Sequence, residues 1–429
     1  MALVIITILL PLVFLIVDFY KERKIYSPAV LFNAIFFVTL LLYSFKWSHI
    51  QQDLSTTTLW CLFLCEIGFN IPIVISYFIK KKDNKKTDEP IIINESADKT
   101  IKTMNNEDGI FTLNKKLEFG IFIFVFVVFV FEVIYCKGFP IIWKLFEDEK
   151  VYINFVVPKV TVWFNAIVVV MGAYSIVNPT LFPGLFYKGF YLLIPLLMVS
   201  RQMIIAMVFE ALIIYLITKK NKSKEFYLYC VIGVMLVLLG FSAFGNVRTG
   251  ESDFLLVAQF KDFCKYIPTV FKWIYSYMCF SISNLNNLIS IAEPGITKGL
   301  STWNELVPSM LDVDSTHLFN EEFLVSLNFN VSTFAPSLYL DFGIFGVGAF
   351  CLIIGACSQF LFKKMKNNFI LNFIYAIAAY SIVFIFFVNM FFNFQVICQV
   401  VFSILIFVVL NNFIEKKSKK VKNSQGGKI

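Results

Sequence analysis

Long apolar runs are the feature that most limits what this chain can fold into. Of its 429 residues, 58% are hydrophobic and only 15% are charged, whereas soluble domains are about 45–50% apolar and about 25% charged. A helix needs about 20 mostly apolar residues to cross the roughly 30 Å hydrocarbon core of a bilayer. Eleven segments have this character, at residues 2–17, 28–45, 59–79, 119–136, 160–177, 185–200, 203–217, 226–244, 337–362, 369–388 and 394–413. The sequence therefore predicts an all-α fold, a polytopic membrane helix bundle of about 11 transmembrane helices.

Clusters of lysine predict which ends of these spans face the cytoplasm. The chain has 37 Lys and Arg residues against 29 Asp and Glu residues. In an eleven-span arrangement the basic clusters all fall on one side of the membrane, at residues 21–24, 80–82, 219–224, 363–366 and 416–420. Because positive residues are retained in the cytoplasm, we expect the N-terminus outside and the C-terminus inside. The same placement accounts for the formal charge of +8 without a nucleic-acid partner.

The spans and their connections divide the chain into six parts. Residues 80–118 are polar and charged, which is typical of a disordered cytoplasmic linker. Residues 245–336 form a large outer loop, and its aromatic and apolar stretches predict short amphipathic helices on the outer membrane face. The expected parts are the N-terminal three helices at 1–79, the linker at 80–118, the central helices at 119–244, the outer loop at 245–336, the C-terminal three helices at 337–413 and a basic cytoplasmic tail at 414–429.

One stretch of the outer loop allows a second interpretation. Residues 268–291 are long enough to form a re-entrant segment or a twelfth span. A full extra crossing would place the lysines at 363–366 outside, which opposes the positive-inside pattern. We therefore expect this stretch to stay on the outer side.

The cysteines and the N-terminus indicate neither a metal site nor a cleaved leader. The nine cysteines lie mostly inside apolar segments, and none forms a CxxC pair or a Cys/His cluster, so we expect packing residues and no metal. The apolar run at 2–17 is followed by Asp18 and a charged turn, without a small-residue cleavage site. We expect a retained first span.

Two of the three arginines stand beside apolar spans. Arg201 lies in the tight turn between two spans, and Arg248 lies in the stretch from Gly245 to Gly250 at the start of the outer loop. A charged side chain beside hydrocarbon is costly and often marks a functional site, and guanidinium binds phosphate oxygens in pairs. The pattern predicts an anion site that grips a pyrophosphate. Alternatively, Arg201 only marks the membrane boundary and Arg248 pairs with Glu251.

The outer loop also holds the candidates for acid–base chemistry. His317 has an ordinary pKa near 6.5, which suits a general base at neutral pH. Glu251 and Asp253 follow because they lie near Arg248. Other carboxylates of the same loop have the same chemical capacity, among them Glu293, Glu305, Asp312, Asp314, Glu321 and Glu322. A solvated surface charge is the commoner role of such residues.

A third set of residues has the chemistry of a sugar site. Tyr275, Tyr277, Asn284 and Asn287 offer stacking surfaces and hydrogen bonds, although at helical spacing such residues more often pack or cap. Asp341 opens the span at 337–362 next to glycines. It either lines a cavity or complements the positive end of a helix dipole.

Three short motifs together resemble the O-antigen polymerase family, the oligosaccharide repeat-unit polymerases. The first is Ser200-Arg201 between two spans. The second is the stretch from Gly245 to Gly250, which opens a large outer loop containing residues 275–287. The third is Tyr339-Leu-Asp341-Phe-Gly343-Ile-Phe-Gly346 at the start of a span. The resemblance covers roughly residues 120–413.

The resemblance implies a membrane glycosyltransferase of the bacterial inner membrane, acting on its periplasmic face. Both substrates would be oligosaccharides linked to undecaprenyl pyrophosphate. A hydroxyl of one repeat unit would attack the anomeric carbon of the growing chain, and undecaprenyl pyrophosphate would leave. Arg201 and Arg248 match the family's outer-loop arginines and would hold the pyrophosphate. No cofactor is implied, and a chain-length regulator and a flippase are the expected protein partners.

Two other functions remain open from the sequence. A lipid-linked oligosaccharide flippase would carry charges deep inside its spans and often shows paired repeats. An O-antigen ligase would depend on a histidine in the outer loop, which keeps His317 of interest.

Overall fold

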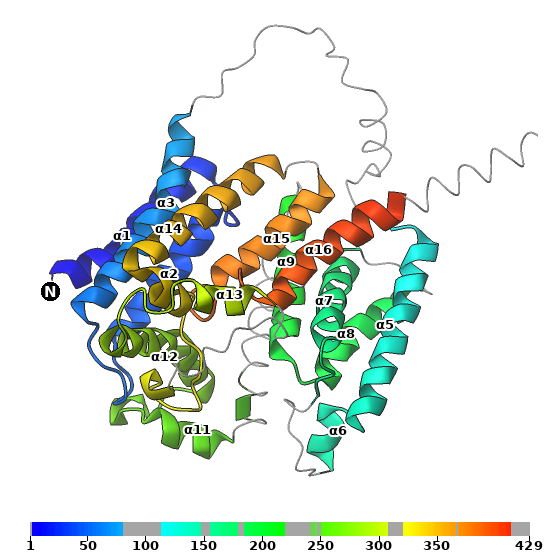
Figure 1. Cartoon of the computed structure of the whole chain (residues 1–429), viewed down its shortest axis with the longest axis horizontal. Helices are drawn as coiled ribbons and strands as arrows, with labels where there is room; N and C mark the ends of the chain where they lie inside the picture. The colour runs from blue at the N-terminus through cyan, green and yellow to red at the C-terminus, as the bar shows by residue number, and fades with distance from the viewer. Residues whose placement is uncertain are drawn as a thin grey trace, which may run out of the picture. The chain divides into compact units, whose positions relative to one another are not determined.

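The computed structural model describes residues 2–79, 113–146, 155–178, 184–218, 242, 245–246, 250–307, 321–365 and 368–412. These ranges are helical throughout, and their only extended pairing is an isolated bridge between Ser48 and Phe260. Five helices are long and apolar enough to cross a membrane, and five shorter helices are also apolar. The chain is therefore a helical membrane protein (Figure 1).

The helices belong to two compact units, one formed by residues 1–74, 221–363 and 378–397 and the other by 75–220, 364–377 and 398–429. The first unit holds α1 (Ala2–Glu22), α2 (Pro28–Ser44), most of α3 (Thr56–Phe78), α11 (Glu251–Ala258), α12 (Thr269–Ile291), α13 (Leu300–Leu306) and α14 (Ala335–Lys364). The second unit holds α5 (Lys115–Cys136), α6 (Pro140–Leu145), α7 (Thr161–Val177), α8 (Gly184–Leu197) and α9 (Arg201–Thr218). Residues of α15 (Phe369–Val383) and α16 (Phe394–Ile404) fall in both, and α16 continues into a π-helical turn, η6 (Leu405–Leu410).

Ten of the predicted spans coincide with apolar helices, and the segment at 226–244 lies almost entirely outside the described residues. The first span is longer than expected, because α1 continues to Glu22. The linker is shorter than expected at its C-terminal end. Asn114 caps α5 by accepting a hydrogen bond from the Lys116 N–H, so the helix begins at Lys115. The remainder of the predicted linker, residues 80–112, lies outside the described residues.

In the first unit, glycines let the backbones of α3 and α14 approach each other closely. A Cβ atom at Gly68 would overlap the carbonyl oxygen of Gly348, and one at Gly355 would overlap the carbonyl oxygen of Phe69. Small residues at helix crossings are typical of membrane bundles, because there close packing replaces the hydrophobic effect. This contact fixes α14 beside α3.

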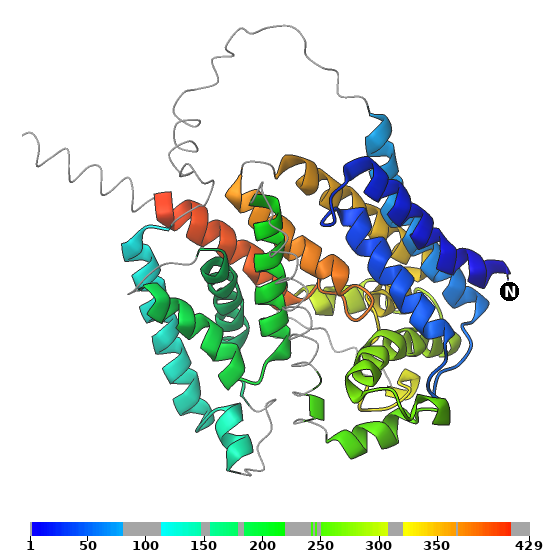
Figure 2. The same ribbon diagram turned by 180° about the vertical axis from the view of Figure 1, so that it is seen from behind.

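Helix α12 lies across one end of the first unit. Near its start, the Tyr275 hydroxyl accepts a hydrogen bond of 2.8 Å from the Trp47 N–H. Near its end, Asn286 Oδ1 accepts bonds from the Ser55 N–H (2.8 Å) and the Thr58 hydroxyl (2.9 Å). Both ends of α12 are thus bound to the connection between α2 and α3 and to the start of α3; Figures 1 and 2 show α12 beside these helices.

In the second unit, α7 packs against α5, α8 and α9. The Met207 side chain of α9 fills the space beside Gly172 of α7. The Thr161 hydroxyl at the start of α7 donates a 2.7 Å hydrogen bond to Glu132 of α5. Helices α7 and α9 lie next to each other in Figure 2.

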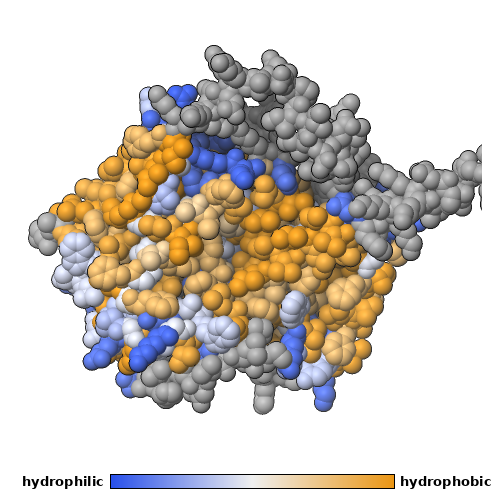
Figure 3. Space-filling view, turned by 45° about the horizontal axis from the view of Figure 1, so that its top comes forward, coloured by the Kyte–Doolittle hydropathy of each residue, from blue (hydrophilic) through white to orange (hydrophobic). Residues whose placement is uncertain are grey.

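The surface has the character expected for contact with lipid. Apolar side chains cover much of the face shown in Figure 3. On α1 and α5, large side chains such as Ile16, Phe124 and Val127 are more than half exposed. Exposed apolar area on this scale is typical of a surface that faces a membrane.

Candidate functional site

The chemistry-bearing residues of the outer loop gather on one helical layer, residues 250–307, which contains α11, α12 and α13. This layer binds the α2–α3 connection through backbone hydrogen bonds. The Lys261 N–H donates to the Trp47 carbonyl (2.8 Å) and the His49 N–H donates to the Gln259 carbonyl (3.0 Å). The predicted amphipathic helices of the loop are therefore present and packed on the first unit.

Arg248 lies outside the described residues, but its flanks are held in place. The Gly250 N–H donates a 2.9 Å bond to the Asn246 carbonyl, as in a turn of helix. The Trp273 ring nitrogen donates a 2.8 Å bond to Asn246 Oδ1. Gly245 lies against the same ring, where a Cβ atom would clash. Gly245 and Asn246, which precede Arg248 in the chain, thus contact Trp273 of α12.

Arg201 is the first residue of α9, and its side chain is half-buried. Residues 198–200 form the tight turn that the sequence predicts after α8, with Val199 in the left-handed region at φ 52°. Both carboxylate oxygens of Glu210 are buried without a hydrogen-bond partner in the described part of the chain. Glu210 lies on the same helix as Arg201 and was the carboxylate nearest to it in the sequence, but it is therefore not the ion-pair partner of Arg201.

The three candidate bases are placed differently. Glu251 and Asp253 lie on the exposed first turn of α11. The Thr269 hydroxyl donates a hydrogen bond to Glu251, and Asp253 lies over Gly250. His317 lies outside the described residues.

The two tyrosines of α12 differ in access. Tyr275 is buried, stacks on Trp47 with ring centroids 4.6 Å apart, and donates its hydroxyl hydrogen to Gln51. Burial raises the pKa of Tyr275 above its usual range. Tyr277 is half-buried near Trp273 and Phe387, with ring centroids 5.9 and 5.1 Å away. Tyr275 therefore supports the fold where it stands, and Tyr277 retains an accessible edge.

The asparagines of α12 show the same division. Asn284 is fully buried and binds the backbone of residues 325–331: its amide donates to the Phe329 (2.6 Å) and Val331 (2.8 Å) carbonyls and accepts from the Val325 N–H (2.8 Å). Asn287 is half-buried. Asn284 thus fastens the end of the outer loop to α12.

Asp341 caps a helix from outside it. Its carboxylate accepts hydrogen bonds from the Thr297 hydroxyl and from the N–H groups of Gly299 (2.8 Å), Ser301 (3.2 Å) and Thr302 (2.7 Å). These N–H groups belong to the start of α13, where a helix leaves its donors unpaired. The helix-terminus interpretation of Asp341 describes its position, although the helix it caps is α13 and not its own.

Helix α14 is broken directly after Asp341. Gly343 has φ 67° and ψ −165°, a conformation suited to glycine. The break frees the carbonyls of Tyr339 and Leu340, which accept hydrogen bonds from the N–H groups of Gly295 (3.3 Å) and Thr297 (3.1 Å). Irregular backbone at the edge of a span is tolerated where protein satisfies it. Residues 293–306 and the broken start of α14, residues 335–346, thus form a cradle around the break.

Glu305 is the residue of this cradle with the most unusual chemistry. It lies on α13 and reaches the surface. Surrounding protein raises the pKa of its carboxyl to about 7, and the negative charge of Asp341 contributes to the rise. The sequence groups Glu305 with the other loop carboxylates. The raised pKa of Glu305 depends on the packing of α13 on α14 at the Gly343 break. In the sequence, only the neighbouring glycines indicated that break.

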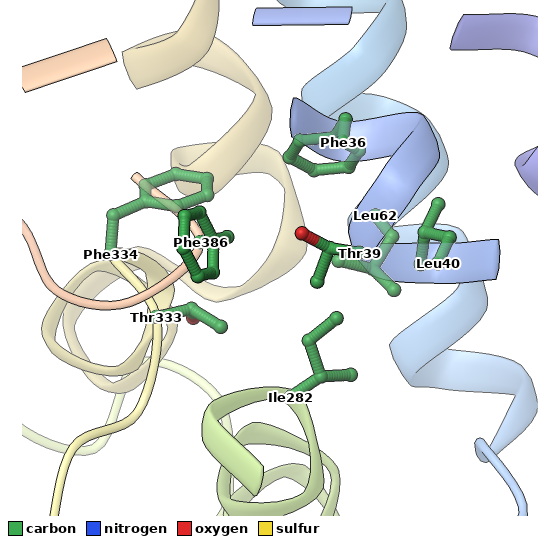
Figure 4. A pocket seen from close by; sticks show the side chains of 8 residues that line it. All are labelled: Phe36, Thr39, Leu40, Leu62, Ile282, Thr333, Phe334 and Phe386. Atoms are coloured by element: carbon green, nitrogen blue, oxygen red, sulfur yellow. The ribbon is translucent and has the colours of Figure 1, made fainter. Parts of the chain in front are cut away.

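The cavity of the first unit offers no second site. It is lined by Phe36, Thr39, Leu40, Leu62, Ile282, Thr333, Phe334 and Phe386 (Figure 4). Its volume is about 10 Å³, which is enough for about one water molecule. The Thr39 hydroxyl donates to the Ile35 carbonyl of its own helix, so the lining is effectively apolar.

Comparisons with known proteins identify no family, so the function is inferred from the site. A scan of protein-family models and searches of curated proteins and solved structures found no match to the chain. Among the described residues, no group of three or more His, Cys, Asp or Glu side chains is arranged to hold a metal ion.

Proposed function

We propose that the chain is an oligosaccharide repeat-unit polymerase, an O-antigen polymerase of a bacterial inner membrane. It joins repeat units carried on undecaprenyl pyrophosphate at the periplasmic face. Arg201 and Arg248 hold the pyrophosphate, and carboxylates of the outer loop serve the attacking hydroxyl. The observation that supports the proposal is the folded helical layer at residues 250–307, which carries exposed carboxylates and packs on the connection between α2 and α3.

Contacts in the first unit support the proposed eleven-span arrangement. The Lys261 N–H binds the Trp47 carbonyl at 2.8 Å, and the Phe334 N–H binds the Ile385 carbonyl at 3.0 Å. The lysine pattern places Trp47, Lys261 and Phe334 outside, and Ile385 near the outer end of its predicted span. If the prediction had missed an odd number of spans between two hydrogen-bonded residues, it would have placed those residues on opposite sides of the bilayer.

Contacts among residues predicted to lie inside support the same arrangement. In the first unit, the Lys24 ammonium lies 5.1 Å from the ring centroid of Phe362. In the second unit, the Asn114 N–H donates a 3.0 Å bond to Asn411 Oδ1. Each pair joins a connection that the lysines assign to the cytoplasm to the predicted inner end of a span.

The proposed reaction needs electrostatic stabilisation more than a cofactor. Charge develops on the leaving pyrophosphate as the anomeric bond breaks, and guanidinium groups oriented toward it lower the barrier. A base must also take the proton of the attacking hydroxyl. The chain offers arginine for the first task and carboxylates or His317 for the second.

Deletion of the gene tests the proposal. Lipopolysaccharide from the deletion strain is separated on a gel. A polymerase predicts core carrying a single repeat unit, and the wild-type ladder returns on complementation. Rough core without any repeat contradicts the proposal and points to a ligase or a flippase.

One observation favours a flippase as the second candidate. Glu66 on α3, Glu132 on α5 and Glu210 on α9 are buried within apolar helices, and charged groups inside spans often mark transport pathways. Labelling of repeat units on the periplasmic face separates the two functions. A deletion strain that still exposes single repeat units there has an intact flippase.

A further inference from the structure

We propose that the cradle at the α14 break is the acceptor subsite, where Glu305 takes the proton from the hydroxyl of a lipid-linked sugar. This inference rests on the proposed polymerase function and assigns a substrate and a base to one part of it. The cradle consists of residues 293–306 and the broken start of α14, residues 335–346.

The cradle contains a buried hydroxyl beside Glu305. Ser337 is 2% exposed, and its hydroxyl oxygen has no hydrogen-bond partner in the described part of the chain. It lies close enough to Glu305 to favour the ionised carboxylate, although the two do not form a regular hydrogen bond. Buried hydroxyls are normally paired. An unpaired one beside a carboxylate is suited to receive the hydroxyl of a ligand.

Hydrogen bonds at the break satisfy its backbone groups. Asp341 is fully engaged with the start of α13, and the carbonyls freed at Gly343 are bound by residues 295 and 297. These contacts fix α13 against α14, and Glu305 is on the last turn of α13. Glu305 is therefore held in place while its carboxyl remains available.

The charge of the cradle selects between the two substrate groups. Glu293, Glu305 and Asp341 are acidic, and Lys298 is the only basic residue in the stretch from 293 to 306. A diphosphate would be repelled by the three carboxylates. A neutral sugar hydroxyl is not repelled, so the cradle fits the acceptor and not the leaving group of the donor.

Apolar side chains around the cradle fit a lipid-linked acceptor. Trp303 on α13 is 48% exposed, and Phe342 and Phe345 on α14 are 55% and 76% exposed. Phe342 also lies beside Gly299. A polyprenyl chain can lie against these rings while its sugar reaches Glu305.

The proposed step balances within the two substrates. The acceptor oxygen forms a bond to the anomeric carbon of the donor as its proton passes to the Glu305 carboxylate. The bond between that carbon and the phosphate oxygen breaks, and undecaprenyl pyrophosphate leaves with the electron pair. Desolvation by the surrounding protein raises the pKa of the Glu305 carboxyl to about 7, with a smaller contribution from the negative charge of Asp341 on α14. Because the base must be ionised, the rate should rise with pH through about 7.

The test uses the full chain in liposomes, with lipid-linked repeat units extracted from the deletion strain. We expect Glu305→Gln to lower kcat by about 100-fold, as removal of a general base does, with little change in KM. The variant should also lose the rise in rate near pH 7. Glu322→Gln, on an exposed carboxylate of the same loop, is the matched control and should keep the wild-type rate and pH profile.

The outcomes separate this inference from the proposed function. If the wild-type chain forms no polymer, the polymerase function itself fails. If the wild type polymerises and Glu305→Gln keeps more than about a tenth of its rate with the same pH profile, the acceptor subsite is refuted and the function stands. Should Glu305→Gln fail to fold, the wild-type profile decides: a rise through about pH 7 supports the inference, and a flat profile contradicts it.

Discussion

At the scale of single residues, Asp341 shows how much a single carboxylate can hold together. It accepts one hydroxyl and three N–H hydrogen bonds and so joins α13 to α14. Its removal would leave these donors unpaired in a buried position, which is costly. The residue is therefore expected to matter for stability whatever the reaction is.

Asp341→Ala should lower the free energy of unfolding by about 2 to 4 kcal/mol. Thermal unfolding of the purified chain, followed with a dye that reacts with newly exposed cysteines, measures the loss. Asp53→Asn is the control, because Asp53 forms an exposed ion pair with Lys46 that is worth about 1 kcal/mol or less. Equal stability of the two variants would show that the capping role is overstated.

The arginines carry a prediction of their own. Arg201→Lys and Arg248→Lys should each abolish polymer, by about 100-fold or more, because lysine cannot offer two parallel hydrogen bonds to phosphate. Protein level and topology should remain normal. Polysaccharide gels of complemented deletion strains give the readout, and wild-type banding from either variant removes that arginine from the site.

Residue types and local patterns predicted the candidate chemistry only in part. The outer loop was expected to carry the carboxylates, and Glu251 and Asp253 do lie on its surface. Composition could not show that Asn284 is saturated by the backbone, because its three partners lie about 40 to 50 residues later in the chain. Nor could it single out Glu305, whose pKa depends on burial that arises only once α13 packs on α14.

At the scale of elements, apolar runs predicted where helices form, because the length and composition of a span are local properties. The break in α14 was harder to predict from the sequence. A run such as 337–362 is uniformly apolar, and only Gly343 with its positive φ interrupts the helix. The placement of α12 depended on contacts with residues more than 200 positions away, Trp47 and Ser55.

The close crossing of α3 and α14 predicts a strong effect of small substitutions. Gly68→Ala and Gly355→Ala should each lower the free energy of unfolding by about 1 to 3 kcal/mol, because the new methyl group overlaps a carbonyl of the partner helix. Gly120→Ala on α5 is the matched control, since a Cβ atom there meets nothing within 4 Å. It should be neutral or stabilising by up to about 1 kcal/mol. Thermal unfolding of the three variants in detergent provides the comparison, and equal midpoints would contradict this packing.

At the scale of the whole molecule, the account depends on which face the helical layer occupies. Cysteines introduced at positions 251 and 317 of a cysteine-free variant should react with a membrane-impermeant maleimide added to intact cells. A cysteine at position 364, beside the lysines that end α14, should stay protected until the membrane is opened. Protection of both outer positions would overturn the orientation.

The most direct test of the central claim is the stoichiometry of the reaction carried out by the purified chain. Reconstituted in liposomes with lipid-linked repeat units, it should form a polymer ladder and release one undecaprenyl pyrophosphate for each new glycosidic bond. Movement of repeat units across the bilayer without bond formation or release of the lipid pyrophosphate would contradict the claim and identify the chain as a transporter.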